Sequence, residues 1–285
     1  MIPYRMGTLF SGSTGNCTYI ETPRARILID AGKCTKTLLL ALSEIGVSPD
    51  SIDAIFITHE HNDHVSALPV LSKKCRIPVY MVYESARKYE KNPPRELCEC
   101  LCLQRDTDFS VSVGDMTVTA FPTPHDSRAS VGYRITVTGE GDDGQCESVA
   151  LGVATDIGYV TETIREGLRG CRSVVVESNH DVEMLREGPY PYDLKQRILS
   201  RRGHLSNPDC ADLCAYLALH GTVDFLLAHL SEQNNVPDIA YDETFAALSG
   251  DIFNLRVASP VDVTLLCENG GKVIPKMQNS LVTKG

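Results

Sequence analysis

The sequence predicts an α/β (α+β) fold in which two mixed β-sheets pack together and helices cover them from outside. Short apolar runs separated by turn residues fill the first half of the chain and give way to helical periodicity, and the second half repeats this order. That repetition indicates two sheets with helices outside. Since a chain of 285 residues can bury one large core, we expect residues 1–285 to form a single domain.

In the first half, strands are expected where apolar runs are bounded by turn residues, and helices where apolar residues recur every three to four positions. The expected strands are 8–10, 18–21, 26–30, 52–58, 79–82 and a pair within 111–121 that turns at Gly114-Asp115. The expected helices are 35–44, closed by Gly46, and 65–74.

The second half opens with strands 131–137 and 149–155 on either side of Gly139-Glu140-Gly141-Asp142-Asp143-Gly144. This segment spells G-x-G-x-x-G, but a nucleotide-binding role needs a following helix, so we interpret it as a hairpin tip. A helix begins at Asn207-Pro208 and ends at His220-Gly221, where His220 suits the helix C-terminus and is taken as structural. The remaining expected elements are strands 173–177 and 223–228, helices 192–201 and 239–248, and a closing hairpin of 261–267 with 272–275.

Composition limits the possible partners and locations. The formal net charge is -10, so a nucleic-acid substrate would need locally positive groups, which two divalent cations would help to supply. The chain has 11 cysteines without a Cys-x-x-Cys pair, no apolar N-terminal signal segment and no run long enough to span a membrane. We therefore expect a soluble, cytoplasmic protein with no membrane partner; the sequence does not predict its oligomeric state.

The segment His59-Glu60-His61-Asn62-Asp63-His64 directly follows the apolar run 55–58 and carries four possible metal ligands. Side chains two positions apart on an extended backbone point the same way, and the residues beyond the strand can curl back toward them. One turn could therefore serve two neighbouring metal ions. Two histidines on one helix face would have to be four apart, so a helical metalloprotease motif is rejected; a solvated polar turn is the simpler alternative.

Three further residues of ligand type follow predicted strands: His125, Asp156 and His229. Each alone would be an ordinary turn residue, but together with the segment 59–64 they complete a set of seven. Two divalent ions about 3.5 to 4 Å apart can share a water molecule, lower its pKa and hold it for in-line attack. Imidazole and carboxylate ligands without thiolate suit zinc or manganese, with iron possible.

The His-x-His-x-Asp-His pattern with a distant His, Asp and His resembles the metallo-β-lactamase superfamily over nearly the whole chain. Several further motifs resemble the YycJ/WalJ subgroup of that superfamily. They are residues 9–16, His125-Asp126, 154–159, Glu177-Ser178-Asn179-His180-Asp181 and Gly203-His204-Leu205-Ser206-Asn207.

The resemblance implies a four-layered αβ/βα sandwich with metals between the sheet edges, and a hydrolase that acts on DNA as a 5′-to-3′ exonuclease. It places His59, His61 and His125 on one metal ion. It places Asp63, His64 and His229 on the other, with Asp156 bridging the two. Asp30 is expected either beside the imidazole N–H groups or as a plain turn cap.

Other functions stay open at this point. A small-molecule hydrolase acting on lactones, thioesters or other esters could use the same metals and would have an apolar pocket. A non-enzymatic protein that keeps only the fold would bind no stoichiometric metal. A flavin-coupled diiron enzyme would need a flavin domain for which there is no room.

Catalytic roles are expected for Asp63, His204 and His180. The two histidines are not needed as ligands and lie in polar segments, where one of them could protonate the departing 3′ oxygen. We expect substrate contacts from Tyr159, whose role follows from the resemblance, from Ser11, Ser13 and Asn16 of the first loop, and from Lys195, Arg197 and Arg201 of a basic run. Phosphate contacts without base reading fit a chain with no tryptophan and 6% aromatics, so no sequence specificity is expected.

The thiols of Cys98, Cys100 and Cys102 would share one face of an extended segment. No fourth ligand completes a structural zinc site, so they are taken as free cysteines.

Overall fold

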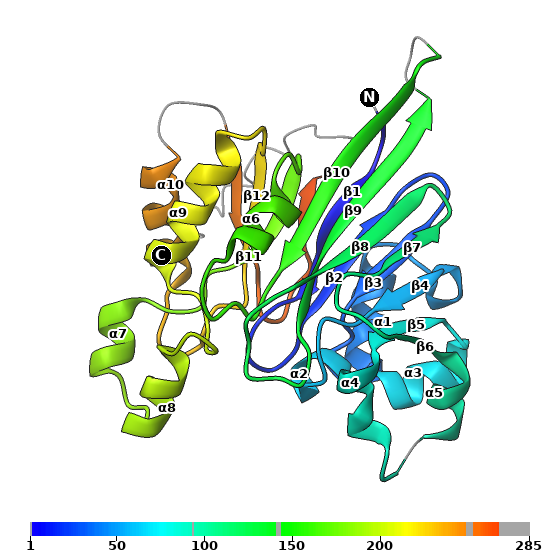
Figure 1. Cartoon of the computed structure of the whole chain (residues 1–285), viewed down its shortest axis with the longest axis horizontal. Coiled ribbons are helices and arrows are strands. Elements are labelled where there is room, and N and C mark those ends of the chain that lie inside the picture. Colours follow the sequence, from blue (N-terminus) through cyan, green and yellow to red (C-terminus); the bar gives the residue numbers. More distant parts are fainter. Residues whose placement is uncertain (1, 93, 141–143, 249–252, 268–285) are drawn as a thin grey trace, which may run out of the picture.

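Two seven-stranded mixed sheets face each other in the computed structural model, which describes residues 2–92, 94–140, 144–248 and 253–267 (Figure 1). In spatial order the first sheet contains β14 (Thr264–Cys267), β1 (Arg5–Phe10), β2 (Cys17–Glu21), β3 (Arg26–Ile29), β4 (Ala54–Phe56), β5 (Val79–Val82) and β6 (Leu101–Gln104). The second contains β13 (Asn254–Val257), β12 (Asp224–Ala228), β11 (Ser173–Glu177), β10 (Cys146–Ala154), β9 (Val131–Glu140), β8 (Met116–Pro122) and β7 (Ser110–Val113).

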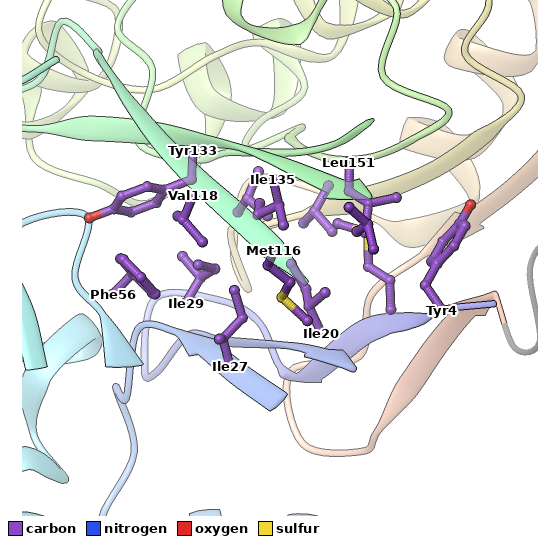
Figure 2. Close-up of a cluster of buried hydrophobic side chains, with 14 of the residues drawn as sticks. Tyr4, Ile20, Ile27, Ile29, Phe56, Met116, Val118, Tyr133, Ile135 and Leu151 are labelled. Carbon is purple, nitrogen blue, oxygen red and sulfur yellow. The ribbon is translucent and has the colours of Figure 1, made fainter. Parts of the chain in front are cut away.

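The inner faces of the two sheets form the central core. Ile27 and Ile29 of β3 point inward and meet Val118 and Ile135 of the opposite sheet, as Figure 2 shows. Successive side chains of a strand point to opposite faces, so Leu28, between the two isoleucines, packs outward in a second apolar cluster. Strands buried on both faces explain why the apolar runs are nearly continuous.

Helices cover the outer face of each sheet, which gives the four layers that the sequence predicts. One outer cluster joins the first sheet to helices α1 (Thr35–Glu44), α3 (Leu68–Cys75) and α5 (Arg95–Cys100). The other joins the second sheet to helices α6 (Glu162–Leu168), α9 (Asn207–Ala218) and α10 (Pro237–Ala247). Helices α7 (Val182–Glu187) and α8 (Tyr192–Ile198) lie at the lower left of Figure 1. Shorter helical turns are η1 (Pro49–Ser51), α2 (Asn62–Val65), α4 (Tyr83–Ala86) and η2 (Arg87–Tyr89).

Parallel pairing brings the important loops to one edge of the molecule. Strands β3 to β6 are mutually parallel, as are β10 to β13, and the predicted ligands follow the carboxyl ends of such strands in both sheets. In open parallel sheets this edge is the usual place for a ligand. His125 is the exception, because it follows β8, which pairs antiparallel with β9.

Several sequence-based boundaries need correction. The helix predicted over 65–74 is two helices, and the first begins at Asn62, within the histidine segment. The helix predicted over 192–201 ends at Ile198, and the extended stretch proposed for the three close cysteines is wrong, because helix α5 runs to Cys100.

Of the predicted closing hairpin, the first arm is a strand only over β14, which pairs with β1, so the pairing of the two arms stays a prediction. The other arm, 272–275, lies outside the described residues, as do residues 141–143 of the predicted hairpin tip. The strands flanking that tip do pair antiparallel, and a strand, not a helix, follows it. In the described part of the chain no helix is long and apolar enough to cross a membrane.

Candidate metal centre

The segment 59–64 turns directly into helix α2, with His61 at the N-cap position. This turn gathers its histidine rings, since the ring centre of His59 lies 4.5 Å from that of His61 and 4.1 Å from that of His64. Gly32 allows the close approach, because a Cβ atom there would lie 1.6 Å from the carbonyl oxygen of Asp63. Lys88 holds the turn from outside by donating to the Glu60 carbonyl (2.7 Å) and to the Asn62 side chain (2.6 Å).

Three residues at the centre have left-handed backbone that side-chain-bearing residues seldom adopt. They are Asp30 (φ 66°) and His229 (φ 58°), each directly after a parallel strand, and Asp156 (φ 57°), two positions after the end of another. Such conformations cost about 1 to 3 kcal/mol each and are typical of functional sites. They turn the side chains into the space between the sheet edges.

All seven predicted ligands come together in this space. The donor atoms of His59, His61 and His125 lie within 4.8 Å of one another, and so do those of Asp63, His64 and His229. Asp156 forms a third such group with His59 and His64, which places its carboxylate between the two trios. No cysteine belongs to any of these groups in the described residues, including the close cysteines of α5 and β6.

Four of the histidines are oriented through their Nδ1 atoms. His64 is bound to Asp30 (2.8 Å), His229 to Glu177 (2.8 Å), His125 to the Gly203 carbonyl (3.0 Å) and His59 to the Thr58 hydroxyl (3.0 Å). The Nε2 atoms are thereby left for the centre. Buried and without a hydrogen-bond partner in the described structure, Nε2 of His59 is an orphaned donor or acceptor that a metal ion would satisfy. The residues present therefore fit divalent metal ions.

The electrostatics of Asp63 and His59 agree with that fit, whereas Asp156 and the other nearby carboxylates raise the pKa values of His64 and His229 against the effect of burial. Burial would raise the pKa of the Asp63 carboxyl, but His64 and His229, whose Nε2 lies 3.6 Å from that carboxylate, lower it well below its ordinary value. Burial lowers the pKa of His59, which keeps its imidazole neutral. Ionised carboxylates and neutral imidazoles are the forms that bind metals. Burial raises the pKa of Asp30, although His64 and Thr58 act in the opposite direction.

Glu177 is a buried carboxylate at the centre that was not among the predicted site residues. Its buried carboxylate accepts hydrogen bonds from Nδ1 of His204 and Nδ1 of His229, both at 2.8 Å, and from the backbone N–H groups of Ile157 (2.6 Å) and Leu205 (3.1 Å). Burial would raise its pKa, but His204 and His229 lower it to about 2. The available signal was its position at the end of an apolar strand, which it shares with Asp156 and His229.

The two histidines expected to take part in catalysis occupy different positions. The ring centre of His204 lies 5.1 Å from that of His125 and 5.2 Å from that of His229, so it belongs to the centre. His204 also lines a cavity of about 170 Å³. His180 is 1% exposed, its Nδ1 has no hydrogen-bond partner in the described structure, and burial lowers its pKa to about 4. It lines none of the cavities described here.

The polar residues of the first loop also differ in burial and in their contacts. Ser11 is buried and accepts from the backbone N–H of His229 at 2.8 Å. Asn16 is buried with its amide nitrogen 3.3 Å from the Asp63 carboxylate and 3.2 Å from Nε2 of His64. Ser13 is exposed and lines the cavity beside His204.

The three basic residues expected to contact substrate, Lys195, Arg197 and Arg201, have different partners in the structure. Lys195 donates to the Arg186 carbonyl (2.7 Å), and Arg197 pairs with the Asp126 carboxylate. Arg201 lies over the ring of Tyr159, with its guanidinium 4.1 Å from the ring centre. Tyr159 and Arg201 line a second cavity, of about 530 Å³, which also reaches His125. His220 binds the Tyr216 carbonyl (2.7 Å) just beyond helix α9, as a structural histidine does.

Comparison with known proteins agrees with this description. Residues 25–229 match the model of the β-lactamase superfamily domain. The chain is 33% identical over 243 residues to exodeoxyribonuclease WalJ of Streptococcus pneumoniae, covering 84% of this chain and 86% of that protein. It is 35% identical over 236 residues to exodeoxyribonuclease YycJ of Bacillus anthracis, covering 81% and 84%.

Among solved structures, the metallo-β-lactamase fold protein YhfI of Bacillus subtilis superposes with a TM-score of 0.66 at 16% identity, covering 93% of this chain and all of that one. That likeness concerns the fold, whereas the family match and the two relatives concern descent. The chain therefore belongs to the metallo-β-lactamase superfamily, in the group that includes WalJ and YycJ.

Proposed function

We propose that this protein is a 5′-to-3′ exodeoxyribonuclease that depends on two divalent metal ions. The observation that carries the proposal is the pair of ligand trios on either side of Asp156, with outer partners that leave the Nε2 atoms facing inward. The two relatives named exodeoxyribonuclease, which align over most of their length, supply the substrate class. DNA is thus the proposed partner, bound without sequence specificity.

In this proposal His59, His61 and His125 would hold one ion, Asp63, His64 and His229 would hold the other, and Asp156 would be a ligand shared by the two groups. Zinc and manganese are the proposed metals, with iron as the next choice, because the ligands are imidazoles and carboxylates. Ions held there would activate a water molecule for in-line attack on a phosphodiester. Asp63 has a catalytic part through its ionised carboxylate, which is 23% exposed at the side chain and so reaches the substrate space.

His204 is the proposed donor to the departing 3′ oxygen. Glu177 holds its Nδ1 atom at 2.8 Å, so Nε2 is the atom left to give a proton. His180 is the weaker candidate because it is buried away from both cavities, but it packs close enough to Glu177 and His204 to influence them.

Among the expected substrate residues, Tyr159, Arg201 and Ser13 are proposed to contact DNA because they line the cavities beside the centre. The positions of Ser11 and Asn16 support a role in holding His229 and Asp63 in place. Lys195 and Arg197 are already engaged by protein oxygens. A small-molecule hydrolase would favour apolar cavity walls, and the arginines lining the cavity of about 530 Å³ argue against it.

The described residues are proposed to act as one domain, since the core between the sheets uses strands from both halves of the chain. The cytoplasm stays the predicted location.

The test is an assay of the purified protein with Mn²⁺ on 5′-phosphorylated single-stranded and duplex DNA. We expect mononucleotides to be released from the 5′ end and about two metal equivalents by elemental analysis. A preparation of Asp63→Ala/His64→Ala made in the same way controls for contaminating nucleases. Turnover of lactones or thioesters without nucleotide release would overturn the proposal.

A further inference from the structure

Two cavities of different character border the metal centre. The smaller one, of about 170 Å³, contains His204 and Ser13, and its one lining carboxylate, Asp126, is paired with Arg197. The larger one, of about 530 Å³, reaches the centre at His125. Pockets that enclose drug-sized ligands measure about 300–1,000 Å³, so the smaller cavity takes part of one nucleotide and the larger one takes more.

The larger cavity is positively charged in an acidic protein. Arg128, Arg201 and Arg202 line it, and no described carboxylate does. None of these three arginines takes part in an ion pair within the described structure, whereas Arg197 does. Unpaired guanidinium groups are suited to bind phosphate oxygens.

These arginines are held in position by contacts that leave their charge free. Arg202 donates to the carbonyls of His125 (3.2 Å) and Ser127 (3.5 Å). Arg201 stacks on Tyr159, and the backbone N–H of Arg128 is bound to Glu60 of the metal-binding turn (2.9 Å). The guanidinium of Arg202 and the backbone of Arg128 are thus tied to segments that carry ligands, and Arg201 is held by Tyr159.

We infer that the cavity lined by Arg128, Arg201 and Arg202 binds the phosphates of the strand that is retained, while the cavity beside His204 takes part of the terminal nucleotide that is released. This inference rests on the proposed function. The leaving oxygen must lie next to the proton donor, which places the leaving nucleotide on the His204 side and the attacked phosphate with the rest of the strand on the His125 side.

The reaction then balances for removal of a 5′-terminal nucleotide. The water oxygen forms a bond to phosphorus, and the bond from phosphorus to the 3′ oxygen of the terminal nucleotide breaks. His204 gives its proton to that oxygen and is restored by the proton that the water loses. The retained strand keeps the phosphate as its new 5′ end. The shortened strand is therefore chemically equivalent to the original substrate, and the three arginines can bind its phosphates in the next cycle.

The test uses the metal-loaded protein and a 5′-phosphorylated single strand whose terminal linkages are phosphorothioates, which resist hydrolysis. Binding is measured by fluorescence anisotropy at several salt concentrations for Arg128→Gln, Arg201→Gln, Arg202→Gln and the triple variant. Each single change should lower the slope of log affinity against log salt by about 0.7, and the triple variant by about 2. Arg24→Gln, an exposed arginine at a different cavity, is the matched control and should keep the wild-type slope.

Strand length supplies a second readout that a loss of folding would not mimic. The triple variant should lose more kcat/KM on a strand of about ten nucleotides than on a dinucleotide, because only the longer strand fills the basic cavity. Equal losses at both lengths, or unchanged salt slopes, would overturn the inference. If the wild type degrades no DNA at all, the proposed function has failed; if it degrades DNA and the variants bind as well as it does, this inference alone has failed.

Discussion

The metal-binding turn, residues 59–64, and the segment 195–204 border the same centre but are held in different ways. In the turn, His59 and His64 are buried and each has a hydrogen-bond partner at Nδ1. In the segment, Arg201 and Arg202 are exposed. The proposed metal ligands thus come largely from one short stretch of sequence, whereas the substrate contacts proposed for Arg201 and Arg202 depend on the position of a peripheral segment. Each region packs closely against a glycine. Gly32 lies against Asp63 of the turn, and a Cβ at Gly158 would lie 2.3 Å from the carbonyl oxygen of Arg201.

The largest effect should come from breaking the turn. Asp63→Ala/His64→Ala removes two of seven donors, and we expect metal content and DNA hydrolysis both to fall to background. Elemental analysis and the nucleotide-release assay measure this. A variant that retained two metal equivalents would show that the turn is not the ligand source.

His204→Gln should separate chemistry from metal binding. Loss of a proton donor typically lowers kcat by about 10²–10⁴-fold, so we expect a drop in that range with metal content unchanged. His220→Gln is the matched control, since this histidine bonds to Tyr216 at the end of a helix. A loss of metal in His204→Gln would instead make His204 a ligand.

Glu177→Gln should affect both metal binding and catalysis, because the Glu177 carboxylate accepts hydrogen bonds from one proposed ligand, His229, and from the proposed proton donor, His204. Removal of such an outer partner usually costs about 10–100-fold in metal affinity or activity. Competition with a chelator measures the affinity, and kcat is measured at saturating metal. Glu183→Gln, an exposed carboxylate on α7, should match the wild type; equal behaviour of the two variants would rule out this role for Glu177.

Gly158→Ala tests the close packing of the segment 195–204 against Gly158 and does not alter the metal-binding turn. The added methyl group must displace the backbone at Arg201, and a loss of about 1.4 kcal/mol in DNA binding would raise KM on the order of tenfold. Metal content should remain. The companion change Gly32→Ala should lower metal content, because it pushes on Asp63. Identical effects of both changes would mean that the two regions do not act separately.

The last expected effect leaves both regions intact and concerns the stability of the folded protein. Burial lowers the pKa of His180 from 6.5 to about 4, so the unfolded chain binds this proton between those pH values and the folded protein does not. The contribution of His180 to the free energy of unfolding is therefore fully present above pH 6.5. It is lost as the pH falls toward 4, by about 3 kcal/mol in total. Urea unfolding of His180→Gln should show a correspondingly smaller loss than the wild type over this range. Parallel losses in the two proteins would contradict the buried neutral state.

Seven residues of the centre could be predicted because they lie in one short segment or at strand ends, whereas residues whose contacts depend on neighbouring segments could not. The six residues 59–64 carry their spacing with them, and strand ends flag His125, Asp156 and His229. Glu177 has no polar neighbour before it, so nothing local separates it from a strand cap. Lys195 and Arg201 belong to the same basic run of the sequence. Because helix α8 ends at Ile198, Lys195 lies on the helix and Arg201 lies beyond it. The strand pairing that defines the two sheets was likewise beyond local pattern, as β14 shows by joining β1 across the chain.

The ligands come from both sheets, and this has a consequence for folding. The turn after β4 belongs to the first sheet, and His125, Asp156 and His229 follow strands of the second. Ions shared between them would act as a removable cross-link between two layers that otherwise meet through apolar contacts and a few hydrogen bonds. Free energy of metal binding would then appear as resistance to separation of the layers, and a chelator would lower the melting temperature by an amount that depends on free metal concentration.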